Sequence, residues 1–157
     1  MKQGKCAFLL VDSEGAVANK HFDKPWQHLK KRDNWNQPEG TADEQCHFMV
    51  QCMESWFLAD VDAVANYFGQ GFIRKHFPSE GQNVEMIERD QVYDKLANAT
   101  KACKKGQYNK AQHSFKILGL INPVKVKQAG PWAKRFFDAL KEHCTQKEGI
   151  QEYPPEA

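Results

Sequence analysis

The chain has 157 residues, of which 41% are hydrophobic and 27% charged, and its formal net charge is +2. This length is typical of one domain that can bury roughly two thirds of its unfolded surface without disulfides or metals. Because no window approaches the ~18 consecutive apolar residues of a membrane-spanning helix, and the start MKQGKC leads into an apolar run too short for a signal peptide, we predict a cytoplasmic protein without membrane contact.

The first informative stretch is residues 7–15, AFLLVDSEG, in which five apolar residues run into two acids. A continuous apolar run predicts a strand buried on both faces, at the centre of a parallel sheet. Ligands of such sheets bind at the carboxyl ends of the strands, which makes Asp12 and Glu14 candidate site residues. Two carboxylates at this spacing can share one divalent cation, Mg²⁺ or Mn²⁺, with waters as further ligands. The alternative is a strand-to-loop turn with solvated acids.

Residues 24–32 begin with Lys-Pro-Trp and predict a short helix with proline in its first turn. Loops are predicted on both sides of it, at 16–23 and 33–43. Residues 46–50 then predict a second strand, which would pass into a helix at about Gln51.

Residues 47–69 are apolar nearly all round a helix and therefore belong inside the protein. Asp60 is typical of an N-cap and Gly69 of a C-cap, which predicts a separate helix between them. Glu54 has two interpretations. Periodicity alone favours a place on the solvent face, whereas a buried carboxylate would have to be paired, hydrogen-bonded or bound to a metal.

Beyond an irregular stretch at 71–82 the chain is predicted to be mostly helical. Three segments carry apolar residues at helical spacing: Val92, Leu96, Ala99 and Cys103; Tyr108, Ala111, Phe115 and Leu118; Trp132, Phe136, Leu140 and Cys144. Residues 117–121 are a doubtful strand, so the sheet is very small or lacks strands. We predict one domain at 1–144 and a flexible tail at 145–157.

The segment from Lys95 to Lys147 has twelve Lys and Arg but only two acids, which gives it a charge of +10 and the remainder −8. Clustered cations attract polyanions. We therefore predict contact with nucleic-acid phosphates through the lysines at the start of this segment. These are Lys101, Lys104, Lys105 and Lys110. The alternative is an ordinary solvated helix face.

Five scattered cysteines without a C-x-x-C pair predict reduced, buried thiols, and the histidines at 47, 76 and 113 have no partner at metal-ligand spacing. We therefore expect these histidines to be structural. The chain also lacks the G-x-S-x-G, Walker A and G-x-G-x-x-G motifs of common hydrolases and nucleotide-binding proteins.

Several motifs together resemble those of one family. They are FLLVDSEG, W-x-H-L-x-x-R-D-x-W at 26–35, HFMVQCMESWFLADVDAVANYFG at 47–69 and Y-x-K at 108–110. From residue 7 to about 140 the chain resembles the Toprim-like proteins grouped as domain of unknown function family 4276. The resemblance implies a Toprim-related α/β fold, as in topoisomerases, primases and nucleases of phage defence, with members often encoded beside ATPases.

In Toprim proteins a glutamate after the first strand and an Asp-x-Asp after a later strand hold magnesium for phosphoryl transfer. Asp12 and Glu14 match the Asp-x-Asp position, with the second acid changed to Glu, and Glu54 matches the family's Glu-x-Trp position. Only six residues precede this match, so the chain resembles the carboxyl-terminal part of the fold. The first strand and its glutamate would then come from another chain, if at all.

These observations predict an α/β protein with a small, incomplete Toprim-like parallel sheet and a mostly helical carboxyl-terminal half. The leading hypothesis is Mg²⁺- or Mn²⁺-dependent nucleic-acid processing by nuclease-type phosphoryl transfer, in phage defence with a partner chain or ATPase. Asp12 and Glu14 would hold the metal, and Glu54 would be a third catalytic acid. The alternative is a non-catalytic binding or assembly subunit.

Overall fold

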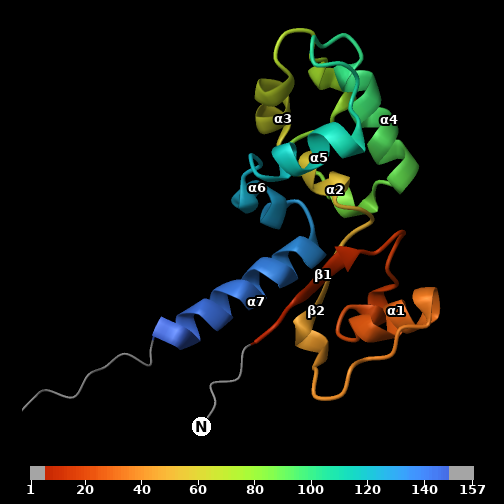
Figure 1. Cartoon of the computed structure of the whole chain (residues 1–157), viewed down its shortest axis with the longest axis vertical. Coiled ribbons are helices and arrows are strands. Elements are labelled where there is room, and N and C mark those ends of the chain that lie inside the picture. The colour runs from red at the N-terminus through yellow and green to blue at the C-terminus, as the bar shows by residue number, and fades with distance from the viewer. Residues whose placement is uncertain (1–5, 149–157) are drawn as a thin grey trace, which may run out of the picture.

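A computed structural model describes residues 6–148, and residues 1–5 and 149–157 lie outside this described part. Within residues 6–148 the chain has the expected mixed α/β composition, with two strands and seven α-helices (Figure 1). No helix in this range is long and apolar enough to cross a membrane. The elements are β1 (Leu9–Asp12), α1 (Pro25–Asp33), β2 (Cys46–Met49), α2 (Glu54–Phe57), α3 (Val61–Phe68), α4 (Arg89–Thr100), α5 (Lys110–Leu118), α6 (Pro123–Gln128) and α7 (Pro131–Glu148).

The two strands run parallel, with Leu9 opposite Cys46 and Asp12 opposite Met49. The second strand is therefore confirmed. The prediction that the first strand is buried on both faces is wrong, because all four residues of β1 are only partly buried. Within the described residues β1 has β2 as its single neighbour, so it forms one side of the sheet rather than its centre.

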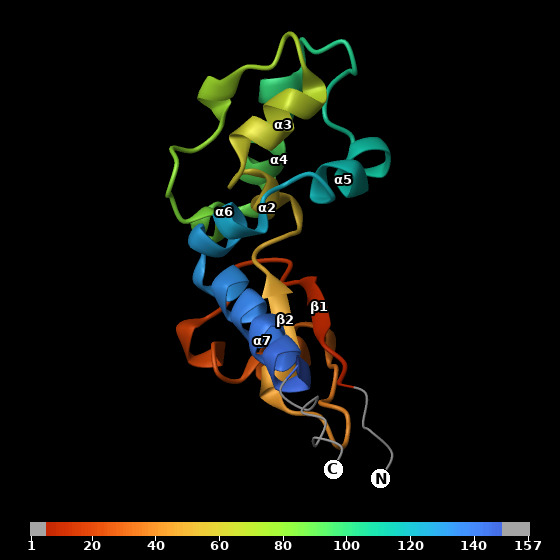
Figure 2. The same cartoon turned by 90° about the vertical axis from the view of Figure 1, so that its left-hand side faces the viewer.

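Side chains of β2 alternate between the two faces of the sheet, as the pleat of a strand requires, and α7 contacts both, with Trp132 against Phe48 and Phe136 against His47. Cys46 and Phe48 belong to a buried cluster with Trp26 and Leu29 of α1. His47 points the other way, and its ring centroid lies 5.3 Å from that of Phe136 on α7. Figure 2 shows α7 running along the sheet. The small sheet is thus held between helices that lie far apart in the sequence.

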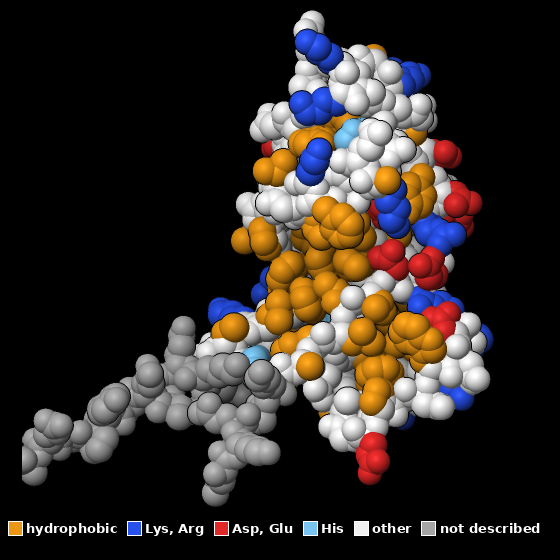
Figure 3. All heavy atoms as spheres, in the orientation of Figure 1, with side chains coloured by type: hydrophobic (Ala, Val, Ile, Leu, Met, Phe, Trp, Pro, Cys, Tyr) orange, Lys and Arg blue, Asp and Glu red, His pale blue; other side chains and the backbone are white. Residues whose placement is uncertain are grey.

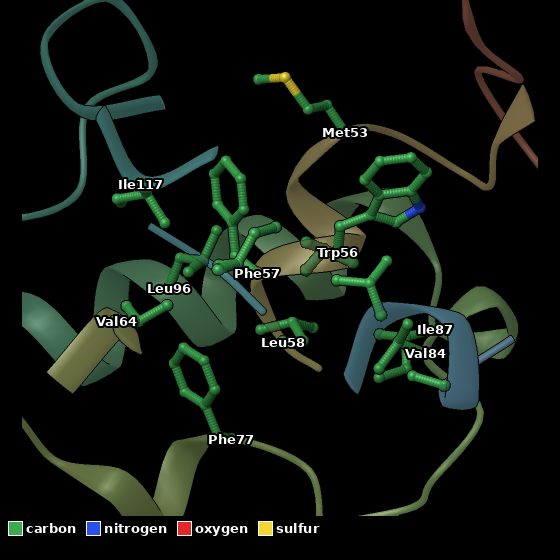
Figure 4. Close-up of a cluster of buried hydrophobic side chains, with 14 of the residues drawn as sticks. Met53, Trp56, Phe57, Leu58, Val64, Phe77, Val84, Ile87, Leu96 and Ile117 are labelled. Atoms are coloured by element: carbon green, nitrogen blue, oxygen red, sulfur yellow. The ribbon is translucent and has the colours of Figure 1, made fainter. Parts of the chain in front are cut away.

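The remaining helices surround α2 and form a second, larger core (Figures 1 and 4). Phe57 of α2 is fully buried and packs among Leu96 of α4 and Ile117 of α5. Val64 of α3 completes this side of the core. The chain passes into this core directly from the end of β2, so the carboxyl end of the sheet faces the helical region.

A buried carboxylate fixes the start of α7. Glu85 accepts hydrogen bonds from the backbone N–H groups of Trp132 at 3.1 Å and Ala133 at 2.9 Å. These two donors have no partner within the helix, so the glutamate takes the role of a capping side chain from a distant segment. Gly130 makes this approach feasible, because a Cβ there would lie 2.2 Å from the carboxyl carbon of Glu85.

The local helix signals are confirmed at α3. Asp60 caps it by accepting from the N–H of Ala63 at 3.3 Å, and Gly69 follows its last residue with φ of 74°. The helix expected from Gln51 instead begins at Glu54 and has a single turn. The alternative strand at 117–121 is wrong, because α5 continues to Leu118 and a turn follows.

Three further predictions need correction. The buried face of residues 108–118 differs from the predicted apolar face, since Phe115 is 79% exposed while His113 and Ile117 are buried. Helix α7 continues to Glu148, beyond the predicted start of the tail at 145, and the rest of that tail lies outside the described residues. Of the five cysteines, which are all free, Cys6 and Cys144 are exposed rather than buried.

We expect the stability of the protein to fall as the pH is lowered from about 6.5 to about 4. Burial and the nearby Arg135 lower the pKa of His47 to about 4, so the unfolded chain binds this proton and the folded chain does not. The loss attributable to His47 should approach ~3 kcal/mol. When the free energy of unfolding is measured with urea across this pH range, it should change less steeply with pH in His47→Gln than in the wild type. An unchanged slope in that variant, with His76→Gln as control, would contradict the assignment.

Glu85→Gln should lower the free energy of unfolding by about 1 to 3 kcal/mol, because a neutral amide cannot accept from both α7 donors and presents its own N–H₂ to them. Urea denaturation measures the loss. The matched control is Glu88→Gln, an exposed position close by, where a change within ~0.5 kcal/mol is expected. Equal stabilities for the two variants would rule out a capping role for Glu85.

Candidate functional site

Asp12 connects the end of β1 to the start of α2. Its Oδ1 accepts from the N–H of Met53 at 2.8 Å, and its backbone carbonyl accepts from the Arg32 guanidinium at 2.6 Å. Burial raises the pKa of Asp12, against the lowering effects of the Met53 N–H and of Lys110, and the negative charges of Glu54 and Glu14 raise it further. The carboxylate of Asp12 is therefore partly buried, and it is affected by the charge of a second acid, Glu54.

That second acid, Glu54, is fully buried, with 0% of its side chain exposed. The interpretation of Glu54 as part of a solvent face is wrong, because α4 and α5 cover the single turn of α2. Its Oε1 accepts from the Tyr108 hydroxyl at 2.9 Å and its Oε2 from the Tyr93 hydroxyl at 3.2 Å. The ammonium of Lys110 lies 3.5 Å from Oε1.

The three groups that contact Glu54, namely Tyr93, Tyr108 and Lys110, keep their protons. Burial and the negative charge of Glu54 raise the pKa of Tyr93 to about 12 and that of Tyr108 still further. The pKa of Lys110 is also raised, since attraction by Glu54, Tyr93 and Asp12 outweighs the lowering effect of its partial burial. Two phenol donors and one ammonium thus surround one carboxylate, an arrangement that holds negative charge in the interior.

Glu14 points to another part of the molecule. It has a left-handed backbone conformation, with φ of 61°, and its carboxylate forms an ion pair with Arg89 at the start of α4. The structure therefore joins Asp12 to Met53, the neighbour of Glu54 in the sequence, while Glu14 pairs with Arg89. Within residues 6–148 no group of three His, Cys, Asp or Glu side chains is arranged to hold a metal ion.

The predicted phosphate-binding lysines divide into two sets. Lys101, Lys104 and Lys105 are exposed in the connection between α4 and α5, and none of them forms an ion pair with an acid of the described residues. The ammonium of Lys105 lies 5.6 Å from the centre of the Tyr67 ring. Lys110 differs, because it belongs to the group around Glu54. We call the first three lysines the basic end.

Several other cations of the positive segment are already neutralised. Lys125 pairs with Asp60 and Asp62, while Lys127 and Lys134 both pair with Asp138. Lys101, Lys104 and Lys105, which lie at the end of the molecule farthest from the sheet, remain without an ion pair to any acid of residues 6–148, as do Lys20, Lys24, Lys30 and Lys31 in and before α1. Figure 3 shows Lys and Arg side chains at that end and also lower on the same face.

Sequence reasoning missed Tyr93 and Arg89. Tyr93 lies next to Val92 in a helix whose apolar spacing gives no sign of a polar partner, and Arg89 is one cation among many on the surface. Tyr108 was noticed as part of the Y-x-K motif and of the apolar spacing at 108–118. The two residues of this motif, Tyr108 and Lys110, both contact Glu54, so that motif was the available signal.

One comparison with known proteins gives a match. The model of the family described as "Domain of unknown function (DUF4276)" matches residues 2–141. No curated protein and no solved structure matches the chain. The matched range includes Asp12, Glu54 and the whole basic end.

Tyr108→Phe should destabilise the protein by about 1 to 3 kcal/mol, because it removes a hydrogen bond to a buried charge and leaves one lone pair of Glu54 without its partner. Tyr67→Phe is the matched control, since the hydroxyl of Tyr67 has no hydrogen-bond partner among the described residues and should contribute within ~0.5 kcal/mol. Thermal and urea unfolding of both variants would test this. Similar losses in the two would show that the Tyr108 hydroxyl does not stabilise Glu54.

Proposed function

The chain belongs to the DUF4276 family, and we propose that it is a nucleic-acid-binding protein of Toprim-like fold that does not catalyse phosphoryl transfer by itself. The observation that carries this proposal is the separation of its charges. The lysines of the basic end have no acidic partner in the described part of the chain, whereas the acids at the end of β1 are already engaged.

The basic end has the features that phosphate backbones require. Lys101, Lys104 and Lys105 lie within five residues of one another on an exposed connection. An aromatic ring, Tyr67, lies beneath one of them at 5.6 Å. Cations beside aromatic side chains are typical of surfaces that bind single-stranded or flexible nucleic acid, where bases stack and phosphates pair with lysine.

The acids fit a divalent metal poorly. Glu14 is paired with Arg89, and both oxygens of Glu54 accept phenol hydrogen bonds. Of the two expected metal ligands, Asp12 alone remains, and one of its oxygens accepts from the Met53 N–H. A catalytic Mg²⁺ or Mn²⁺ would have to displace several of these contacts, so the proposal uses no metal-dependent step.

A second candidate is the metal-dependent function expected from the sequence, namely nuclease-type phosphoryl transfer in phage defence. The observation in its favour is that Asp12 lies at the carboxyl end of a parallel strand, where α/β folds bind ligands, and accepts from the N–H of Met53, the neighbour of Glu54. This parallel pair with acids at its end also supports the Toprim-like assignment. Catalysis would then require a further carboxylate from a partner chain, such as an associated ATPase.

Lys104→Glu combined with Lys105→Glu should weaken the binding of labelled single-stranded DNA and RNA. The slope of log K against log salt should also become smaller by about 1.4, because two phosphate contacts are lost and each contributes about 0.7 on a single strand. Fluorescence anisotropy at several salt concentrations measures both quantities, and EDTA should have no effect. The matched control is Lys30→Glu with Lys31→Glu on α1, which changes the net charge equally at the opposite end of the molecule. Equal affinities and slopes for the two double variants would refute binding at the basic end.

A further inference from the structure

Phe115 has the largest exposed fraction of the large apolar side chains in residues 6–148, with 79% of its surface open to solvent. It lies in the second half of α5, two residues before Ile117, which is fully buried in the larger core. Single exposed apolar residues are common on protein surfaces and need no explanation by themselves. The residues around Phe115, however, suit one particular kind of ligand.

Small residues flank Phe115 along the helix. Residues four positions apart are neighbours on one face of a helix, and for Phe115 these are Ala111 and Gly119, both exposed. Neither has a side chain larger than a methyl group, so no bulky neighbour covers the ring from either direction along α5. The ring is therefore open to a flat ligand.

The surface around this ring is positively charged. The sequence contains no acid from Lys95 to Phe137. Lys116 directly follows Phe115, is exposed, and forms no ion pair with an acid of the described residues. A ligand that reaches Phe115 therefore also meets an unpaired ammonium group.

This face of α5 is continuous with the basic end. The ring centroid of His113 lies 6.0 Å from that of Tyr67, and the ammonium of Lys105 lies 5.6 Å from the centre of the same Tyr67 ring. At about 100° per residue, Lys116 lies between His113 and Phe115 around the helix. Burial, and then the positive charges of Lys116 and Lys105, lower the pKa of His113. The surface thus leads from Lys105 over Lys116 to Phe115.

We propose that Phe115 stacks against an unpaired base, so that the basic end binds single-stranded nucleic acid rather than a duplex. This inference rests on the proposed function and names the class of nucleic acid that it takes. A base has a flat face that stacks on an aromatic ring regardless of sequence, while its phosphates pair with neighbouring lysines. In a duplex the faces of the bases are covered by one another, so the lysines would find phosphates but the ring would find no partner. An apolar protein segment would cover the ring without using the lysines.

Phe115→Ala should weaken the binding of labelled oligothymidine by roughly tenfold, the size of effect that loss of one base–aromatic stack produces. The slope of log K against log salt should not change, because no phosphate contact is lost. Binding of a duplex of the same length should be unaffected. Phe115→Leu keeps an apolar side chain without a flat ring and should also weaken binding, whereas Phe115→Tyr should bind as the wild type does. Fluorescence anisotropy measures all of these affinities.

The matched control is Met86→Ala. Met86 is 77% exposed and precedes the start of α4, whereas the basic end follows the last residue of that helix. Its removal should leave oligothymidine binding unchanged. Phe115→Trp gives a direct measurement, because a stacked base should quench the added indole beyond any change in the four tryptophans of the wild type. The melting temperatures of all these surface variants should match that of the wild type.

Two results would overturn this inference while leaving the basic end intact. The first is equal oligothymidine binding by Phe115→Ala and the wild type, together with the expected loss in the double variant of Lys104 and Lys105; the ring would then be free for contact with another protein. The second is a loss in Phe115→Ala that is the same for duplex and single strand. If the wild type binds no oligonucleotide at all, the proposed function fails, and this inference fails with it.

Discussion

The negative charge of Glu54 is the constraint on which the arrangement of the helices depends. A carboxylate with no solvent contact is stable only when donors surround it. Here the donors come from two different helices, Tyr93 on α4 and Tyr108 with Lys110 at the start of α5. Satisfying this one charge therefore fixes both helices relative to α2. The apolar contacts of Phe57 with α4 and α5 also hold these helices against α2.

Two other acids, the partly buried Asp12 and the buried Glu85, connect elements in a similar way. Asp12 accepts from the backbone at Met53 and so joins the end of β1 to α2, while Glu85 accepts from the first turn of α7. Each carboxylate satisfies backbone donors that would otherwise be unpaired. The sheet is too small to organise the chain alone, since it has two strands of four residues in the described part. Acids at these junctions link the sheet to both groups of helices.

This use of acids explains why the charges of the molecule are separated. Acids that could bind a metal are engaged in holding the fold, as Glu54 and Glu14 show. Lysines near an acid, such as Lys125, are neutralised by it. The lysines of the basic end lie beyond the reach of these acids. An unpaired cluster of cations at one end and an internally neutralised acidic site are the features on which the proposed functions rest.

The sequence by itself determined the features that depend on neighbouring residues. Its apolar run predicted β1, and the caps at Asp60 and Gly69 predicted the limits of α3, because these signals act over a few residues. Only the tertiary structure decided that β1 lies at one side of the sheet and that Glu54 is buried. The hydrogen-bond partners of Glu54 are 39 and 54 residues away along the chain. Helical periodicity records which residues share a face, but it cannot record which face another helix will cover.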